Sequence, residues 1–384
     1  KPGVAGWINA PNLHRDLDWR GDPAGDAWFS FFRGRVAPPP GEPYLDHDWG
    51  MVNGAIDEIL RGPREQPLCI YLPLGFPHPP YHCEDPWFSA VRRDRIKDRI
   101  PAPPSWQGKP VLLKGIVELQ RLQGWSEERW RELRATYWAM CARTDHQWGL
   151  LVEALRRAGR YDSAAMFCFA DHGDFTGDYG LVEKTQNTFE DCLSRVPFVI
   201  KPPAGVAVRP RVSEALAELV DLPATVYDLA GITPRYTHFG RSLTPVLAGA
   251  EEHRDAVFCE GGRLPGEIQA MENESASHNP PGEGLYWPRI HWQTRDEGPH
   301  HGKAAMCRTR TRKYVRRLLE QDELYDLERD PGETRNLVDD PAYRADLIAL
   351  RERMLTWYQQ TCDTVPWQPV ARNFGGTAPE PRRA

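Results

Sequence analysis

Short apolar runs, separated by longer polar and proline-rich segments, set the hydrophobic pattern of this chain. Residues 67–75, 166–170 and 195–201 are such runs, and each is followed by a turn or by prolines. Short continuous apolar runs are typical of strands that are buried on both faces of a mostly parallel sheet. The pattern therefore predicts three buried strands at these positions.

Helical spacing dominates the segment between the first two of these runs. Ser126 is a suitable N-cap and two acidic residues follow it, while Gly159 is suited to the position after the last helical turn. One apolar face is predicted from an i, i+3/i+4, i+7 pattern, formed by Tyr137, Cys141, Trp148, Leu151, Val152 and Leu155. Helices are also predicted at 51–60 and at 213–229, the latter interrupted near Asp221.

The C-terminal part has a different pattern, with short alternating segments and basic turns. It predicts small antiparallel strands and an amphipathic closing helix, at residues 256–260, 303–309, 313–318, 323–328 and 341–361. The residues from 261 to 303 form a long excursion rich in Gly, Pro and His, which we expect to shape a pocket because loops of this length are usually functional or disordered.

Together these patterns predict an α/β fold, in which helices flank a mixed, mostly parallel sheet. We expect the α/β domain to occupy residues 1–250 and a smaller α+β subdomain to occupy residues 251–365. Residues 366–384 are predicted to be a flexible tail because of their Gly and Pro content.

Composition narrows the class of protein. The chain has 384 residues, of which 27% are charged and 40% hydrophobic, as in a soluble globular protein. A net charge of −6, from 48 basic and 54 acidic residues, gives no signal for nucleic acid or for an anionic membrane. No apolar run approaches the roughly 20 residues of a membrane helix. Nucleic-acid and membrane partners are therefore not expected, and oligomerisation is left open.

The cysteines and the chain start bear on compartment and completeness. Eight cysteines are scattered without a C-x-x-C pair, so neither a zinc ribbon nor a disulfide framework is expected. This slightly favours a cytoplasmic location, which the sequence otherwise leaves unknown. The chain begins at Lys1-Pro2 without an initiator Met or a signal peptide, which suggests a fragment or a processed chain.

The first candidate for chemistry is Asp171-His172-Gly173, directly after the predicted strand 166–170. Ligands in open α/β sheets bind at the carboxyl ends of strands, and carboxylate and imidazole groups both bind divalent ions. A solvated turn with an Asx-type hydrogen bond is the alternative. A similar group, Asp46-His47-Asp48, follows no predicted strand, and a solvated turn is the better interpretation there.

Two further candidates are His78 and Lys184. His78 follows the predicted strand 67–75, and prolines on both sides restrict the backbone around it, which suits a substrate-binding or general-acid role. Lys184 ends a glycine-rich segment shortly after the Asp-His pair, where an ammonium group could bind an anion or stabilise a leaving oxygen. The alternatives are a surface turn for His78 and an ordinary exposed lysine for Lys184.

Taken in order, these motifs resemble those of the sulfatase family of the alkaline phosphatase superfamily, over roughly residues 45–360. The stretches that carry the resemblance are His78-Pro79-Pro80-Tyr81, the helix around Tyr137 and Asp145 that leads to Asp171-His172-Gly173-Asp174, Gly177 through Lys184 with Arg195-Val196-Pro197, and Glu323 through Asn336-Leu337. Each stretch is weak alone, and their common order makes the resemblance specific. His-Pro-Pro followed by an aromatic residue is closest to the arylsulfatase and phosphonate monoester hydrolase branch.

The resemblance implies an alkaline-phosphatase-like fold and a role for each motif residue. Asp171 and His172 would be ligands of one divalent ion, Ca²⁺ in most sulfatases and Mn²⁺ or another transition metal in some relatives. Lys184 would contact the sulfate or phosphate oxygens, and His78 would contact the ester oxygen and protonate the leaving group.

One departure from the family is large. The family nucleophile lies in a Cys/Ser-x-Pro-x-Arg motif whose Cys or Ser becomes formylglycine, and neither this motif nor the N-terminal acidic metal ligands occur here. Cys192-Leu-Ser-Arg195 lacks the proline and the spacing, and we reject it as the nucleophile. We expect these elements to precede Lys1 in the parent protein, so that this chain holds the C-terminal two-thirds of the domain.

The resemblance therefore implies a metal-dependent hydrolase of sulfate esters, acting on a small-molecule ester. Two alternatives stay open at this point: a phosphonate monoester or phosphodiester hydrolase of the same family, and a catalytically inactive, sulfatase-like binding protein, because the nucleophile motif is absent.

Overall fold

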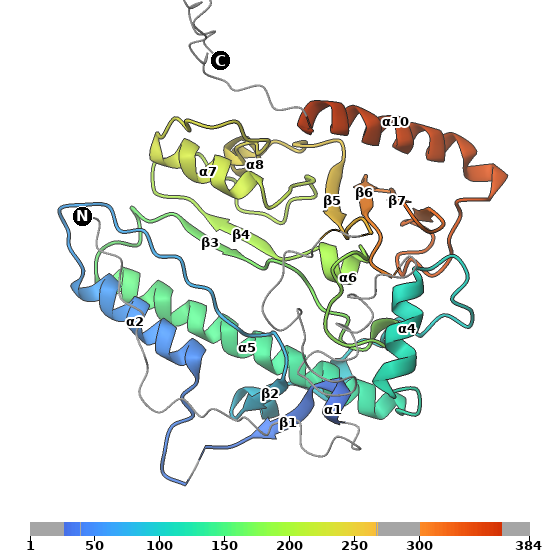
Figure 1. Cartoon of the computed structure of the whole chain (residues 1–384). Helices are drawn as coiled ribbons and strands as arrows, with labels where there is room; N and C mark the ends of the chain where they lie inside the picture. The colour runs from blue at the N-terminus through green and yellow to red at the C-terminus, as the bar shows by residue number, and fades with distance from the viewer. Residues whose placement is uncertain (1–26, 39, 266, 268–299, 363–384) are drawn as a thin grey trace, which may run out of the picture. The chain divides into compact units, whose positions relative to one another are not determined.

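The computed structural model describes residues 27–38, 40–265, 267 and 300–362 (Figure 1). The chain forms two compact units, and each is described by itself. Unit 1 comprises Lys1–Ala164, Cys168–Phe198 and Arg263–His301, and unit 2 comprises Ala165–Phe167, Val199–Gly262 and Gly302–Ala384. The domain limits predicted at residues 250 and 365 stay predictions. The predicted tail and most of the long excursion lie outside the described residues.

Unit 1 is built around the long helix α5 (Glu127–Arg157), which packs against α2 (His47–Arg61), α3 (Trp87–Ala90) and β2 (Tyr81–Glu84). The side chain of Ser126 accepts a hydrogen bond of 3.2 Å from the backbone N–H of Arg129 and caps the helix. Gly159, with φ of 65°, follows the last turn in a left-handed conformation that glycine adopts without strain. Both predicted ends of this helix are confirmed.

The buried face of α5 differs from the predicted one. Cys141 is exposed, whereas the polar residues Arg143 and Gln147 are fully buried. Arg143 is buried because carboxylates surround it: its guanidinium lies 2.5 Å from Asp46 and 3.2 Å from Glu84. A search for apolar residues alone misses a stripe that contains a paired arginine.

The remaining regular elements of unit 1 surround this helix. They are α1 (Ala27–Ser30), β1 (Phe32–Val36), which pairs in parallel with β2, η1 (Arg93–Arg95), α4 (Val111–Gln120), η2 (Asp178–Gly180) and α6 (Asp191–Ser194). One buried apolar cluster joins β1, β2 and α5, and a second joins α4 to the segment around Phe175 and Leu181.

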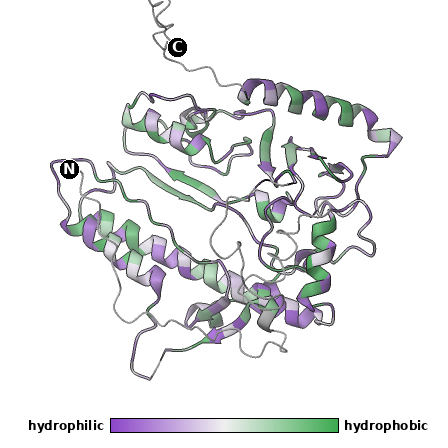
Figure 2. Cartoon of the chain, viewed as in Figure 1, coloured by the Kyte–Doolittle hydropathy of each residue, from purple (hydrophilic) through white to green (hydrophobic). Residues whose placement is uncertain are grey.

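Two of the three strands predicted from apolar runs are present. They are β3 (Met166–Phe169) and β4 (Phe198–Lys201), which pair with each other and are mostly apolar (Figure 2). Their residues are mostly half-buried, so the prediction that both faces are covered was wrong for the described residues. Residues 67–75 form no strand, and Ile70 and Tyr71 are 40% and 77% exposed. No described strand pairs with this segment, and an apolar run becomes a strand only through such pairing.

Unit 2 contains an antiparallel sheet in the order β5 (Val257–Gly261), β6 (Ala304–Arg308), β7 (Arg312–Arg317) and β8 (Glu323–Asp326). Each strand is antiparallel to its neighbour, with Cys307 opposite Tyr314 in the β6–β7 pair. The predicted C-terminal strands are therefore confirmed.

Helices complete unit 2. The 3₁₀ turn η3 (Pro341–Tyr343) leads into α10 (Arg344–Thr361), whose Leu350 and Met354 join the buried cluster of the sheet. The other helices are α7 (Asp221–Ala230) and α8 (Thr244–Ala248). The helix predicted from residue 213 begins only at Asp221. None of the described helices combines the length and the apolar character that crossing a membrane requires.

Candidate active site

The turn after β3 is fixed by a close backbone contact at Gly173. The Gly173 N–H donates to the Leu193 carbonyl oxygen at 2.7 Å. A Cβ atom on residue 173 would lie 1.9 Å from the carbonyl oxygen of Cys192, so only glycine fits here. The contact holds the residues after β3 against α6 and thereby positions the preceding Asp171-His172 pair.

Asp171 and His172 are joined by a local hydrogen bond and offer a pair of potential ligands. The Asp171 Oδ1 atom accepts the His172 N–H at 3.0 Å, while Asp171 Oδ2 lies 3.7 Å from His172 Nε2. His172 Nδ1 is 2.8 Å from the Gly173 carbonyl, which only accepts, so Nδ1 carries the proton and Nε2 presents its lone pair. The two side chains are 85% and 37% exposed, as open ligands would be.

These residues fit one side of a metal site. Among the described residues, no group of three or more His, Cys, Asp or Glu side chains is arranged to hold an ion. One carboxylate oxygen and one imidazole nitrogen suit Mn²⁺ or another transition metal better than Ca²⁺, which prefers oxygen ligands alone. The pair can therefore contribute to a metal centre and would need further ligands to complete it.

The segment that carries His78 is held in place at its start by a buried carboxylate. Asp48, near the N-terminus of α2, accepts hydrogen bonds from the N–H groups of Gly75 at 2.7 Å and Phe76 at 2.8 Å. Burial raises the pKa of Asp48 although these donors oppose the shift. The Arg143 guanidinium lies 3.8 Å from the centre of the Phe76 ring. The solvated turn predicted around Asp48 was wrong, since this carboxylate is buried and positions the His78 segment.

A buried tyrosine joins all three segments of the site. The Tyr81 hydroxyl donates to both carboxylate oxygens of Asp174, at 2.8 and 2.9 Å, and accepts the Glu183 N–H at 2.7 Å. Burial and the neighbouring Asp174 hold the pKa of Tyr81 well above its usual value, so the phenol keeps the proton that it donates. Because Tyr81 follows His78 and Glu183 precedes Lys184, this node connects the residues of the site across the chain.

The result is that His78, His172 and Lys184 come together. Lys184 Nζ is 2.5 Å from His78 Nε2 and 2.8 Å from Glu183 Oε1, and the two imidazole rings lie 6.4 Å apart. His78 Nδ1 is 2.7 Å from the Pro79 carbonyl oxygen, so Nδ1 carries the proton and Nε2 accepts from the ammonium. Burial, and then the charge of Lys184, lower the pKa of His78.

Three residues of this arrangement were not assigned a role from the sequence: Tyr81, Asp174 and Glu183. Tyr81 and Asp174 stand at the ends of His-Pro-Pro-Tyr and Asp-His-Gly-Asp, so their place in those motifs was the available signal. Glu183 is adjacent to Lys184, but adjacency does not show that its carboxylate is buried against the lysine, as it is here.

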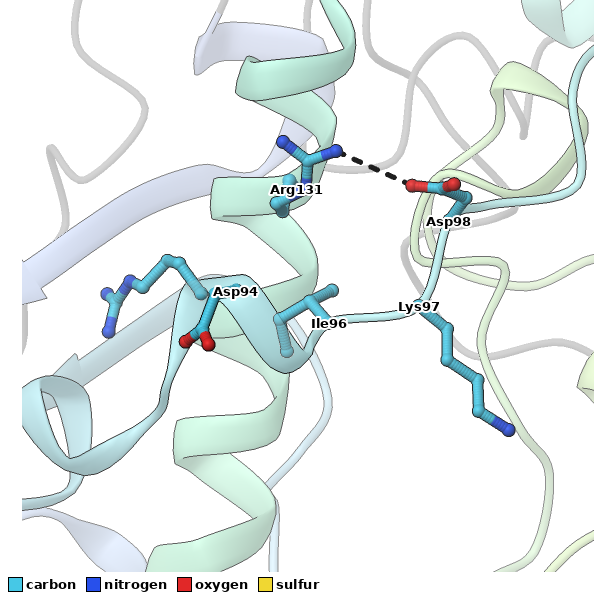
Figure 3. A pocket seen from close by; sticks show the side chains of 6 residues that line it. Asp94, Ile96, Lys97, Asp98 and Arg131 are labelled. Carbon is cyan, nitrogen blue, oxygen red and sulfur yellow. Dashed lines mark hydrogen bonds and ion pairs between the residues drawn. The ribbon is translucent and has the colours of Figure 1, made fainter.

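A pocket of about 450 Å³ elsewhere in unit 1 does not belong to this site (Figure 3). It is lined by Arg93, Asp94, Ile96, Lys97, Asp98 and Arg131. Arg131 and Asp98 form a surface ion pair of 3.4 Å across it, and none of the predicted site residues lines it. Its charged walls are explained by exposed side chains that pair with one another.

Comparison with known families identifies the chain. The sulfatase family model matches residues 24–232, which include His78, Asp171, His172 and Lys184. The chain belongs to the sulfatase family. This membership confirms the resemblance that the motifs indicated.

Curated relatives of this sulfatase chain are similar over part of their length. Arylsulfatase K of Danio rerio is 30% identical over 237 residues, which are 56% of this chain and 44% of that protein. A Δ4,5-hexuronate-2-O-sulfatase of Bacteroides thetaiotaomicron is 25% identical over 324 residues, which are 81% of this chain and 60% of that protein. The sulfatase chain thus spans about two to three fifths of the length of these relatives.

Solved structures confirm the predicted fold class. The phosphonate monoester hydrolase of Agrobacterium radiobacter superimposes with a TM-score of 0.68 at 23% identity, covering 85% of this chain and 62% of that chain. A second solved structure, from Bacteroides thetaiotaomicron, has a TM-score of 0.58 at 23% identity, covering 85% of this chain and 68% of that chain. The α/β fold of the sulfatase chain is therefore alkaline-phosphatase-like.

Proposed function

We propose that this sulfatase-family protein is a metal-dependent hydrolase of sulfate esters. The observation that carries the proposal is the convergence of Lys184 and His78, 2.5 Å apart, beside the His172 ring. Three motifs that are distant in the sequence supply an ammonium, an imidazole and a potential metal-ligand pair at one place. A plain structural domain gives no reason for this combination.

Lys184 is suited to bind the anionic ester. Its side chain is 27% exposed, so the ammonium can reach an oxygen of a bound sulfate group while it keeps its contact with Glu183. A fixed positive charge at the group that gains negative charge in the transition state lowers the barrier, because the charge is in place before the reaction.

His78 is suited to the leaving group, with one condition. Its Nε2 atom accepts from Lys184 and its pKa is lowered, so at neutral pH the imidazole is an acceptor rather than an acid. His78 can protonate a departing alcohol only after Nε2 has taken up a proton from solvent, because Lys184 keeps its own proton as the fixed positive charge.

Asp171 and His172 would hold a divalent ion, Ca²⁺ or a transition metal such as Mn²⁺. The ion would supply positive charge at the ester oxygens when it is bound. The nucleophile and the remaining ligands are not found here: the sequence contains no Cys/Ser-x-Pro-x-Arg motif, and no group of three or more metal-binding side chains occurs in the part of the chain that the structure describes. We propose that they come from residues outside this sequence, which is consistent with the greater length of the relatives.

Phosphonate monoesters and phosphodiesters are the alternative substrates. The motif His78-Pro79-Pro80-Tyr81 favours them, and a phosphonate monoester hydrolase shares the fold. A sulfatase-like binding protein without turnover is the remaining alternative.

The test is an assay of the purified product of the complete gene against aryl sulfates, aryl phosphonate monoesters and phosphodiesters. We expect hydrolysis that a chelator abolishes, with sulfate esters preferred. His78→Ala and Lys184→Ala should each lower kcat/KM by roughly tenfold or more, the scale of a lost acid or charge-stabilising group. Lys97→Ala, which changes an exposed lysine outside the site, is the control. Wild-type kinetics in both site variants would remove these assignments. Absence of turnover with every ester would favour the alternative, a sulfatase-like binding protein.

A further inference from the structure

Both the side chain and the backbone of Glu183 are held in place by neighbouring residues of the site. Its side chain is 1% exposed, and Oε1 lies 2.8 Å from Lys184 Nζ and 3.6 Å from His78 Nε2. Its backbone is fixed as well, because the N–H donates to Tyr81 and the carbonyl oxygen accepts from Phe175 at 2.8 Å. The residue has φ of 65°, a conformation that non-glycine residues seldom adopt. The Glu183 carboxylate thus places a fixed negative charge beside the Lys184 ammonium and the His78 imidazole.

This carboxylate lies within reach of the charge on any bound ester. A hydrogen bond from Lys184 Nζ to an ester oxygen is about 2.9 Å long, so that oxygen lies within roughly 6 Å of Glu183 Oε1. At this distance the carboxylate repels the bound anion, while the ammonium attracts it. The two fixed charges of the Glu183–Lys184 pair are opposite and equal, so the pair attracts an anion much less than a lysine alone would.

We propose that Glu183 is a specificity-determining residue, which favours esters whose transferred group carries one negative charge over esters whose transferred group carries two. This inference rests on the proposed function of the site as an ester hydrolase. Sulfate monoesters, phosphodiesters and phosphonate monoesters carry one negative charge on this group. Phosphate monoesters carry nearly two above pH 7, because their second pKa is about 6.

The expected size of the discrimination follows from Coulomb's law. At roughly 6 Å and an effective dielectric constant of about 20, one additional negative charge on the ester corresponds to a factor of roughly one hundred in binding or rate. Solvent at the partly exposed Lys184 lowers this factor, so at least roughly tenfold is expected. Glu183→Gln removes the charge and keeps the shape and the acceptor oxygen.

The experiment compares two substrates with the same leaving group, 4-nitrophenyl sulfate and 4-nitrophenyl phosphate, at pH 8. We expect Glu183→Gln to raise the ratio of kcat/KM for the phosphate to kcat/KM for the sulfate by roughly tenfold or more. Glu183→Asp, which keeps the charge, should stay near the wild-type ratio. Should Glu183→Gln fail to fold, Glu183→Gly replaces it, since glycine accepts φ of 65° without strain.

Glu333→Gln is the matched control. It removes a carboxylate from a buried lysine in unit 2, and its active fraction should keep the wild-type ratio, because a ratio does not depend on how much protein is folded. An unchanged ratio in Glu183→Gln, or an equal loss for both substrates, would overturn the inference and leave the proposed function standing. Absence of hydrolysis by the wild type would remove the proposed function and this inference with it.

Discussion

Glu183 and Glu333 are buried glutamates that each hold a lysine, one in each unit, and their surroundings differ. Glu183 and Glu333 are 1% and 2% exposed, and both have a left-handed backbone, with φ of 65° and 51°. Glu333 binds Lys313 Nζ with both carboxylate oxygens at 2.8 Å, and Lys313 is fully buried in the antiparallel sheet. Glu183 binds Lys184 through one oxygen, and that lysine also contacts His78 and is 27% exposed.

The two pairs differ in whether the cation reaches solvent, with Lys184 27% exposed and Lys313 fully buried. Burial of a carboxylate beside a lysine is common to both pairs and therefore does not discriminate. In the Lys313 pair both charges are enclosed, so the pair can affect only the stability of the fold. In the Glu183 pair the carboxylate is enclosed while the ammonium and the imidazole reach solvent, which leaves them able to bind a ligand.

The largest expected effect concerns the enclosed pair. Glu333→Gln removes the carboxylate that binds the enclosed ammonium of Lys313, so we expect the free energy of unfolding to fall by about 3 kcal/mol. Urea denaturation followed by circular dichroism measures it. A loss below about 1 kcal/mol would mean that Lys313 relaxes to solvent or loses its proton, and the distinction between an enclosed and an open pair would then fail.

A second prediction tests whether Tyr81 positions the site. Tyr81→Phe removes the hydroxyl that joins Asp174 to the Glu183 N–H, and leaving these groups without it should cost about 1–3 kcal/mol of stability. It should also lower kcat/KM, because the segments that carry His78 and Lys184 lose their common anchor.

Tyr314→Phe is the control for that change. In unit 2, the Tyr314 hydroxyl donates to Asp322 at 2.7 Å and accepts from Arg351 at 3.1 Å, so its loss should lower stability to a similar degree. The kinetics of the folded Tyr314→Phe protein should be those of the wild type. Equal kinetic effects of both variants would assign Tyr81 to stability alone.

The sequence was sufficient for features that depend on local order. Asp171 and His172 were placed at the end of β3 because an apolar run stops there, and the antiparallel strands of unit 2 were found from short segments separated by basic turns. Ser126 and Gly159 marked the ends of α5 because capping depends on a few neighbouring residues. His78 and Lys184 were found as polar residues in constrained loops, and the structure places them in contact.

Features that depend on partners distant in the chain were not predictable. Arg143 is buried only because Asp46 and Glu84 reach it from other segments. The run at 67–75 has the composition of a strand, but no described strand pairs with it. The role of Glu183 depends on a left-handed φ and on the hydroxyl of Tyr81, and the sequence specifies neither.

The smallest expected effect is the loss of stability caused by Glu183→Gln. Glu183→Gln makes the same chemical change as Glu333→Gln, yet it should lower the free energy of unfolding by no more than about 1 kcal/mol. The reason is that Lys184 is already 27% exposed, so its ammonium can regain hydration when the carboxylate is lost. The same urea denaturation, run on both variants, measures the difference. A loss as large as that of Glu333→Gln would make Glu183 a structural counter-charge, whereas a small loss with an altered substrate ratio would separate its electrostatic role from any contribution to the fold.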